Sequence, residues 1–130
     1  MAKSRIYLDS ARVIKEAAVG GPNEEAFLHS ELGVIYAGLG RRSDAIREGK
    51  RSVEMLPLSK EAYRGGTMLY QLARIYVLTG DYDSAVDILN QLLTVPSIVS
   101  VPELQVDPFW KPLAGNPKFE KLLASQPKAQ

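Results

Sequence analysis

Hydrophobic residues along the chain recur at intervals of three and four, which is the spacing of one face of an α-helix. No segment shows the apolar–polar alternation of period two that marks a half-buried β-strand. Two stretches show the helical spacing most clearly, and their shared faces hold His29, Leu32, Gly33 and Tyr36 in one and Leu69, Leu72, Ala73 and Tyr76 in the other. The pattern therefore predicts an all-α protein without a sheet.

The two stretches are copies of one internal repeat. Residues 32–40 align with residues 72–80 at an offset of 40, and Leu, Ile, Tyr and Gly coincide. The same offset aligns residues 43–46 with residues 83–86, and a third, partial copy begins at residues 9–13. Each full unit predicts two helices joined by a turn, and the partial copy corresponds to a second helix alone.

Glycine and aspartate mark the turns inside the units. Gly40 and Gly80 follow the last periodic residue of each first helix, where a left-handed residue commonly ends a helix. Asp81 is placed to cap the next helix. Ala45 and Ala85 keep the side chains small where the paired helices approach each other.

The second unit is longer than the first. Six additional residues lie near 58–65, and we expect them to extend the first helix of this unit at its N-terminus. Gly65 and Gly66 fall in this region and predict a kink or break, because glycine is a poor helix former.

This pattern resembles the tetratricopeptide repeat, a unit of 34 residues with W-x2-L-G-x2-Y, then A-x3-F, then P. The first unit has Leu32-Gly33-x2-Tyr36, Ala45 and Pro57, with His29 at the Trp position and Gly49 at the Phe position. The second unit has Leu72-Ala73-x2-Tyr76, Ala85 and Leu89, with Leu69 at the Trp position and Pro96 one residue early. Another type of helix–turn–helix repeat is the alternative.

The resemblance implies an all-α, right-handed solenoid of helix–turn–helix repeats with capping helices at its C-terminal end. We expect one domain over residues 1–125, followed by a frayed tail at 126–130. Its expected parts are a half repeat at 4–22, a repeat at 24–57, a second repeat at 60–96 and a cap at 97–124.

The expected cap covers the last repeat, which otherwise exposes its stacking face. Asp107-Pro108 and Asn116-Pro117 are each typical of a helix cap followed by proline in the first turn. They predict short helices near 108–113 and 117–124. The side chains expected to pack on the last repeat are Phe109, Trp110, Leu113, Phe119 and Leu122. A ligand-binding role for Phe109 and Trp110 is the alternative.

A narrower resemblance rests on residues 48–60, 96–104, 107–113 and 116–119. These segments are similar to the C-terminal repeat region of large bacterial regulatory proteins, in which such repeats follow nucleotide-cyclase, serine/threonine-kinase or winged-helix DNA-binding domains. The resemblance implies a sensing or scaffolding module.

Composition excludes several kinds of chemistry. The chain has no Cys and one His, so it can form neither a disulfide nor a multi-His metal site. With 16 basic and 15 acidic residues, its near-neutral charge does not favour nucleic acid or anionic lipid. The basic segment at 41–51 is interleaved with acidic residues, which favours an ion-paired helix surface over a phosphate site. His29 lies on a packing face, which favours a structural role. We therefore predict no catalytic residue, no cofactor and no metal.

The residue pattern predicts neither a targeting signal nor a membrane segment. Its longest run without a charged residue spans 88–102 and contains two prolines, whereas a membrane helix needs about 20 apolar residues. With no signal-peptide pattern at the start, we expect the cytoplasm and no membrane contact.

The resemblance implies that the first helix of each repeat lines a concave groove. The candidate binding residues are Phe27, Ser30, Val34 and Ala37 in the first unit and Thr67, Tyr70, Arg74 and Val77 in the second. Contact of Phe27, Val34 and Tyr70 with a neighbouring helix is the alternative. Tetratricopeptide repeats that bind the C-terminal tails of chaperones use Lys, Asn and Arg to bind the terminal carboxylate. The expected Lys and Asn are absent here. We expect a non-enzymatic module that binds a peptide or helix of a partner protein; the alternative is a regulatory appendage acting in cis on an attached cyclase, kinase or DNA-binding domain.

The segment at 4–18 matches the second helix of a repeat whose first helix would precede Met1. We therefore expect an apolar face without its usual partner, formed by Ile6, Tyr7, Val13 and Ile14. A patch of this kind is unusual on a monomer. It predicts either a fragment of a longer array or self-association through the N-terminal helix.

Overall fold

The computed structural model describes residues 2–21, 25–57, 62–94 and 99–125, and these residues contain helices and turns but no strand. The longer helices are α1 (Ala2–Ala18), α2 (Ala26–Gly38), α3 (Arg42–Met55), α4 (Ala62–Thr79) and α5 (Tyr82–Leu92). The shorter ones are α6 (Val101–Val106), the 3-10 helix η1 (Pro108–Leu113) and α7 (Pro117–Ser125). The all-α prediction is confirmed.

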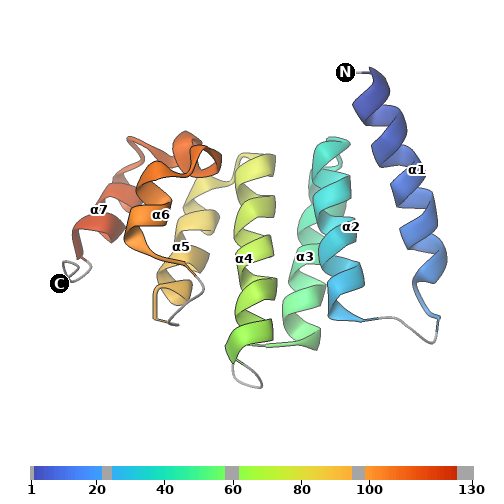
Figure 1. Cartoon of the computed structure of the whole chain (residues 1–130), viewed down its shortest axis with the longest axis horizontal. Helices are drawn as coiled ribbons and strands as arrows, with labels where there is room; N and C mark the ends of the chain where they lie inside the picture. The colour runs from blue at the N-terminus through green and yellow to red at the C-terminus, as the bar shows by residue number, and fades with distance from the viewer. Residues whose placement is uncertain (1, 22–24, 58–61, 95–98, 126–130) are drawn as a thin grey trace.

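The helices stand side by side in a row, from α1 at one end to the short C-terminal helices at the other (Figure 1). α2 packs on α3 and α4 packs on α5, so each predicted unit is a pair of helices. α4 also contacts both helices of the preceding pair, and α1 contacts α2. The row is therefore two stacked helix pairs with a single helix at its N-terminal end.

The local sequence signals end and begin these helices as expected. Gly40 and Gly80 have φ angles of 80° and 85°, in the left-handed region that favours glycine. The Asp81 side chain accepts a hydrogen bond from the Ser84 backbone N–H at 3.2 Å, which caps α5.

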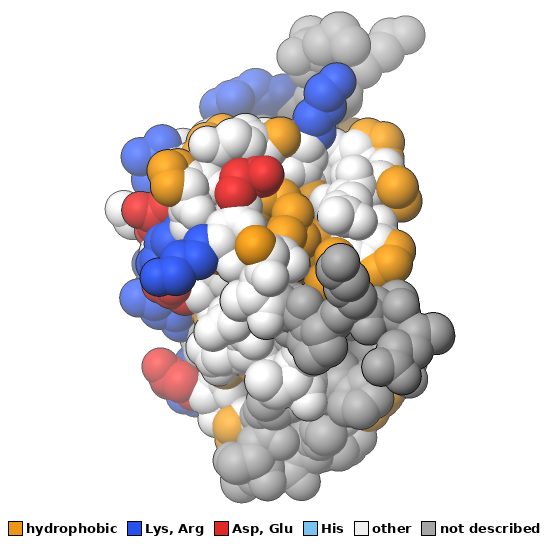
Figure 2. All heavy atoms as spheres, turned by 90° about the vertical axis from the view of Figure 1, so that its left-hand side faces the viewer, with side chains coloured by type: hydrophobic (Ala, Val, Ile, Leu, Met, Phe, Trp, Pro, Cys, Tyr) orange, Lys and Arg blue, Asp and Glu red, His pale blue; other side chains and the backbone are white. Residues whose placement is uncertain are grey.

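The C-terminal helices cover the second pair. Trp110, Leu113, Phe119 and Leu122 are buried in the same hydrophobic cluster as the inward side chains of α4 and α5, which confirms the expected cap. The cap also contains α6, which the sequence pattern did not predict; the Ser100 hydroxyl accepts a hydrogen bond from the Glu103 backbone N–H at its start. Seen from this end, the charged side chains gather mostly toward one edge of the face (Figure 2).

Gly65 and Gly66 predicted a kink or break, and the break is wrong. α4 runs without interruption through both residues. Both glycines are buried, so the packing of α4 outweighs their weak helix propensity. The predicted boundaries that fall at 22–24, 58–61 and 95–98, and the tail at 126–130, lie outside the described residues.

The described residues contain neither a helix suited to a membrane nor a cluster of metal-ligating side chains. No helix there combines the length and apolar character needed to cross a membrane. The same part of the chain brings together no group of three or more His, Cys, Asp or Glu side chains that could hold a metal ion.

Candidate functional site

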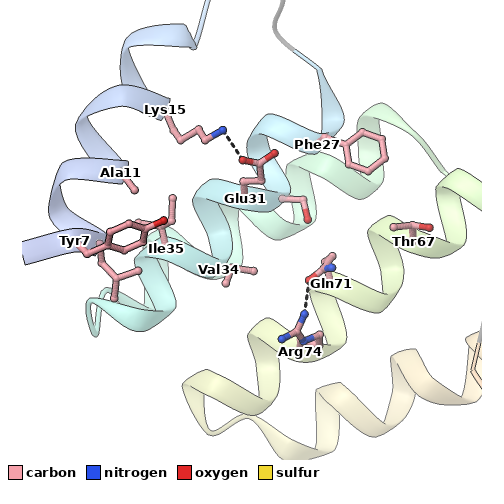
Figure 3. Close-up of a pocket in the computed structure, with 12 residues that line it drawn as sticks. Tyr7, Ala11, Lys15, Phe27, Glu31, Val34, Ile35, Thr67, Gln71 and Arg74 are labelled. Atoms are coloured by element: carbon pink, nitrogen blue, oxygen red, sulfur yellow. Dashed lines mark hydrogen bonds and ion pairs between the residues drawn. The ribbon is translucent and has the colours of Figure 1, made fainter. Parts of the chain in front are cut away.

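Three helices enclose a hollow with a volume of about 470 Å³, which we call the groove. α2 forms its floor, and α1 and α4 form its walls (Figure 3). The lining side chains are Tyr7, Leu8, Ala11 and Lys15 from α1, Phe27, Ser30, Glu31, Val34 and Ile35 from α2, and Thr67, Gln71 and Arg74 from α4.

The floor of the groove is apolar because α2 is apolar on almost every side. Its buried residues face α1, α3 and α4, which all contact it. Phe27 and Val34 lie two turns apart and therefore share the side of α2 that remains open. α2 thus presents Phe27 and Val34 to the groove, with the polar Ser30 and Glu31 between them, while it packs on three neighbouring helices.

An ion pair joins the floor to one wall. The Lys15 Nζ atom on α1 lies 2.5 Å from the Glu31 Oε2 atom on α2 (Figure 3). Both side chains are partly exposed, so the pair contributes little to stability. Its effect on the groove is positional, because it fixes two opposite charges at the rim.

Arg74 supplies a charge on the opposite wall. Its guanidinium lies 4.7 Å from the centroid of the Phe109 ring, and its Nη1 atom donates to Gln71 Oε1 at 3.4 Å. No carboxylate of the described residues forms an ion pair with it. The groove therefore presents a half-buried guanidinium whose position is set by an aromatic ring.

Five of the eight predicted binding residues line the groove: Phe27, Ser30, Val34, Thr67 and Arg74. Ala37 and Val77 instead line a smaller hollow of about 250 Å³ beside the turns that follow α2 and α4.

Tyr70 is placed differently from the prediction. Its ring lies 5.8 Å from the Trp110 ring in an edge-to-face arrangement, and its hydroxyl donates to Glu103 Oε2 at 3.3 Å. Burial, with the Glu103 carboxylate nearby, raises the pKa of Tyr70. Tyr70 therefore belongs to the contact between α4 and the cap. This agrees with the alternative that Tyr70 contacts a neighbouring helix.

The sequence analysis missed the contribution of α1. Tyr7, Ala11 and Lys15 recur at intervals of four residues and border the groove from this helix. That spacing indicates a common face, but it does not indicate which side of α1 looks into the groove. Tyr7, which the sequence predicts on the outward face, is 74% exposed and also stands at the rim of the groove.

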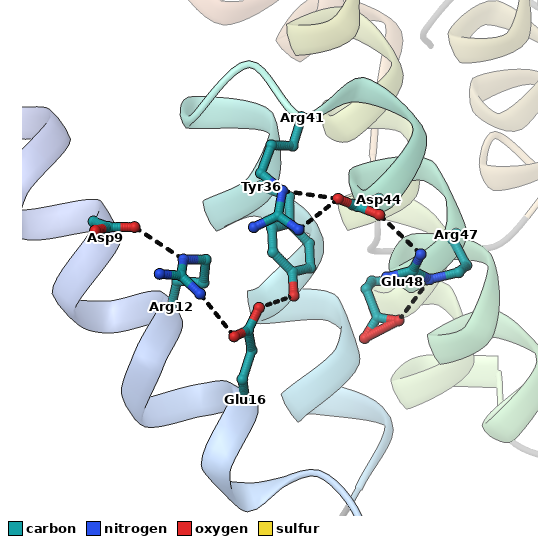
Figure 4. Close-up of polar contacts among 8 residues, drawn as sticks. All are labelled: Asp9, Arg12, Glu16, Tyr36, Arg41, Asp44, Arg47 and Glu48. Carbon is teal, nitrogen blue, oxygen red and sulfur yellow. Dashed lines mark hydrogen bonds and ion pairs between the residues drawn. The ribbon is translucent and has the colours of Figure 1, made fainter.

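Polar contacts hold α1 against the first repeat (Figure 4). Arg12 pairs with Asp9 at 2.9 Å and with Glu16 at 2.8 Å. The Tyr36 hydroxyl of α2 donates to the second carboxylate oxygen of Glu16. Burial and this hydrogen bond raise the pKa of Tyr36 to about 12. The network fixes the wall of the groove that α1 provides.

The basic segment is ion-paired, as expected. Arg41 and Arg47 each lie 2.8 Å from Asp44, and Arg47 also approaches Glu48 at 3.6 Å (Figure 4). Glu48 Oε1 lies 2.9 Å from Nδ1 of His29, and both residues are buried. His29 therefore lies on the packing face between α2 and α3, as predicted.

Comparison with known families adds one finding. Residues 68–100 match the family model of the tetratricopeptide repeat. The matched segment covers most of α4 and all of α5, and thus the second helix pair. The fold agrees with an arrangement of tetratricopeptide type, and the α2–α3 pair has the same form. No curated protein matches the chain, and no solved structure does.

Tetratricopeptide repeats generally mediate protein–protein interaction and are typically non-catalytic. The match supports that general role for the second helix pair. The narrower resemblance to bacterial regulatory proteins stays a prediction.

Proposed function

We propose that the chain is an interaction module that binds a peptide or helix of a partner protein in the groove. The observation that carries the proposal is the apolar-floored hollow of about 470 Å³ between α1, α2 and α4. Binding pockets commonly have volumes of roughly 300–1,000 Å³. The tetratricopeptide match on α4, which forms one wall, supports a protein partner.

The lining favours a segment that combines apolar and acidic groups. Phe27 and Val34 offer an apolar floor for an aliphatic or aromatic side chain. Arg74 offers a guanidinium for a carboxylate, and such charge-assisted hydrogen bonds are stronger than neutral ones. The occupant would thus gain apolar burial and an oriented polar contact from one groove.

The groove is assembled before any partner arrives. α1 is held by its packing on α2 and by the Glu16–Tyr36 hydrogen bond, and Arg74 rests on the Phe109 ring. Walls that are already ordered reduce the entropy lost on binding. The proposal includes neither catalysis nor nucleic-acid binding. A second contact, between the outward face of α1 and another copy of the chain, belongs to the proposal as well.

The test begins with peptides selected from a random library displayed on phage, using the full chain as bait. Their affinities are measured by fluorescence polarisation for the wild type, for Val34→Arg in the floor, and for Val106→Glu as an exposed control on α6. We expect Val34→Arg to weaken binding about tenfold or more and Val106→Glu to leave it unchanged. Equal binding to all three proteins would contradict the proposal.

A further inference from the structure

The side of α1 that faces away from α2 is apolar and open. Ile6, Tyr7, Val13 and Ile14 are 66%, 74%, 55% and 69% exposed. α1 stands at the end of the row, with α2 on one side and no other described helix beyond it (Figure 1). Large apolar side chains that are exposed together on one helix are typical of an interaction site.

The outward residues have the spacing of a helix–helix seam. Ile6, Ser10, Val13 and Ala17 follow one another at intervals of four, three and four residues. Leu8, which faces α2, lies on the opposite side of the helix. α1 thus has two packing faces, one on α2 and one directed outward.

The charged residues beside this seam favour one orientation of a second copy of α1. Arg5, Asp9, Arg12 and Glu16 have the same spacing and form one flank of the helix, with alternating positive and negative charge. Arg12 already pairs with Asp9 and Glu16 within α1, and Glu16 also accepts from Tyr36, so a second copy would extend this network.

If a second copy of the helix runs in the opposite direction, the order of its charges is reversed, so each positive residue lies opposite a negative one. An antiparallel second α1 would therefore place its Glu16 opposite Arg5 and its Arg12 opposite Asp9. In a parallel two-fold pair the charged flank would instead lie beside the other flank, which carries Tyr7 and Ile14, and these ion pairs would not form.

The other flank is compatible with the same register. In an antiparallel pair with two-fold symmetry, the same flank of each copy lies on the same side of the seam. The register that pairs Arg5 with Glu16 places Tyr7 opposite Ile14 of the second copy. Because Tyr7 also stands at the rim of the groove, the two grooves would open on the same side of the dimer.

We propose that two copies of this chain pair through α1 in an antiparallel, two-fold arrangement, with Ile6, Val13 and Ala17 in the seam and the charged flank pairing across it. This deepens the self-association included in the proposed function and is independent of what the groove binds. The dimer would present two grooves on one side, so that a partner with two binding segments would gain avidity.

Cysteine cross-linking tests the geometry, because the chain contains no cysteine of its own. In the proposed register Ser10 lies next to the symmetry axis, whereas the two copies of Ala17 lie roughly 20 Å apart along the helices, at 1.5 Å per residue. A disulfide needs Cα atoms within about 7 Å. Under oxidation we expect Ser10→Cys to form a covalent dimer rapidly and Ala17→Cys to remain largely uncross-linked. Equal cross-linking of both variants, or none by Ser10→Cys, would overturn the proposal.

Sedimentation equilibrium tests the seam in solution. We expect the wild type to dimerise with rising concentration, and Val13→Glu to raise the dissociation constant about tenfold or more. Val106→Glu makes the same change at an exposed site on α6 and should not affect dimerisation. A wild type that stays monomeric, or a Val13→Glu dimer as tight as the wild type, would contradict the pairing. The groove variant Val34→Arg should still dimerise. Failure of the groove proposal and failure of the dimer proposal are therefore distinguishable, because the first changes only peptide binding and the second only sedimentation.

Discussion

The two helices of the first repeat meet at Gly33, and a single added methyl group there should destabilise the protein. A Cβ atom at Gly33 would lie 2.6 Å from Ile75 Cδ1, 3.1 Å from the carbonyl oxygen of Ala45 and 3.3 Å from the backbone nitrogen of Gly49. The Ile75 methyl group is the end of a flexible side chain and can turn away. The two backbone atoms belong to α3, so relieving their contacts requires α2 and α3 to separate.

Two opposing terms set the size of the effect. Overpacking a core typically costs about 1–3 kcal/mol. Replacing glycine by alanine inside a helix gains about 1 kcal/mol of helix propensity. We therefore expect Gly33→Ala to lower the free energy of unfolding by about 1 kcal/mol, since the backbone contacts cannot be relieved locally.

Gly49→Ala is the matched control. A Cβ atom there would meet only the Cδ1 atoms of Ile75 and Leu72, both at 2.9 Å, and these side-chain ends can shift. The propensity gain then offsets the packing cost, and we expect a change within about 0.5 kcal/mol. Urea denaturation followed by circular dichroism gives both free energies. A Gly33→Ala variant as stable as the wild type, or no less stable than Gly49→Ala, would refute the close approach of α2 and α3.

Three further substitutions test other parts of the structure. Glu48→Ala removes a buried partner of His29 and should cost about 1–3 kcal/mol in urea denaturation; unchanged stability would mean that the pair does not form. Trp110→Ala should cost about 3–5 kcal/mol and speed hydrogen exchange around Tyr70, and exchange as slow as in the wild type would contradict the packing of the cap. The pKa of Tyr36 is about 12 in the folded protein, against 10.0 for free tyrosine. Between these pH values the unfolded chain loses a proton that the folded chain keeps, so the free energy of unfolding falls as pH rises. Tyr36→Phe should make the free energy of unfolding fall less steeply over this pH range. If the variant and the wild type show the same slope against pH, the raised pKa is contradicted.

Features that depend on neighbouring residues could be predicted from the sequence. Gly40, Gly80 and Asp81 act within one turn of the chain, so their types and positions were enough to locate helix ends. The cap was predictable for the same reason, since Asp107 and Asn116 cap the helices that carry Trp110 and Phe119.

Features that depend on distant residues could not be predicted. Tyr70 has the helical position of a groove residue, but Glu103 and Trp110 fold over it from a segment more than 30 residues away. Gly65 and Gly66 read as a break because propensity describes a helix in isolation, whereas burial against neighbours keeps α4 continuous. The wall that α1 gives to the groove depends on how this helix is turned against α2.

Hydrogen exchange with a selected peptide tests the central claim most directly, because it reports where on the full chain the peptide binds. Exchange is measured by mass spectrometry on the wild type with and without saturating peptide. The groove predicts slower exchange in α2 around Val34 and in α4 around Thr67 and Gln71, with little change in α5 or α7. Slowing confined to the C-terminal cap, or to α3 around Arg47 and Arg51, would contradict binding in the groove.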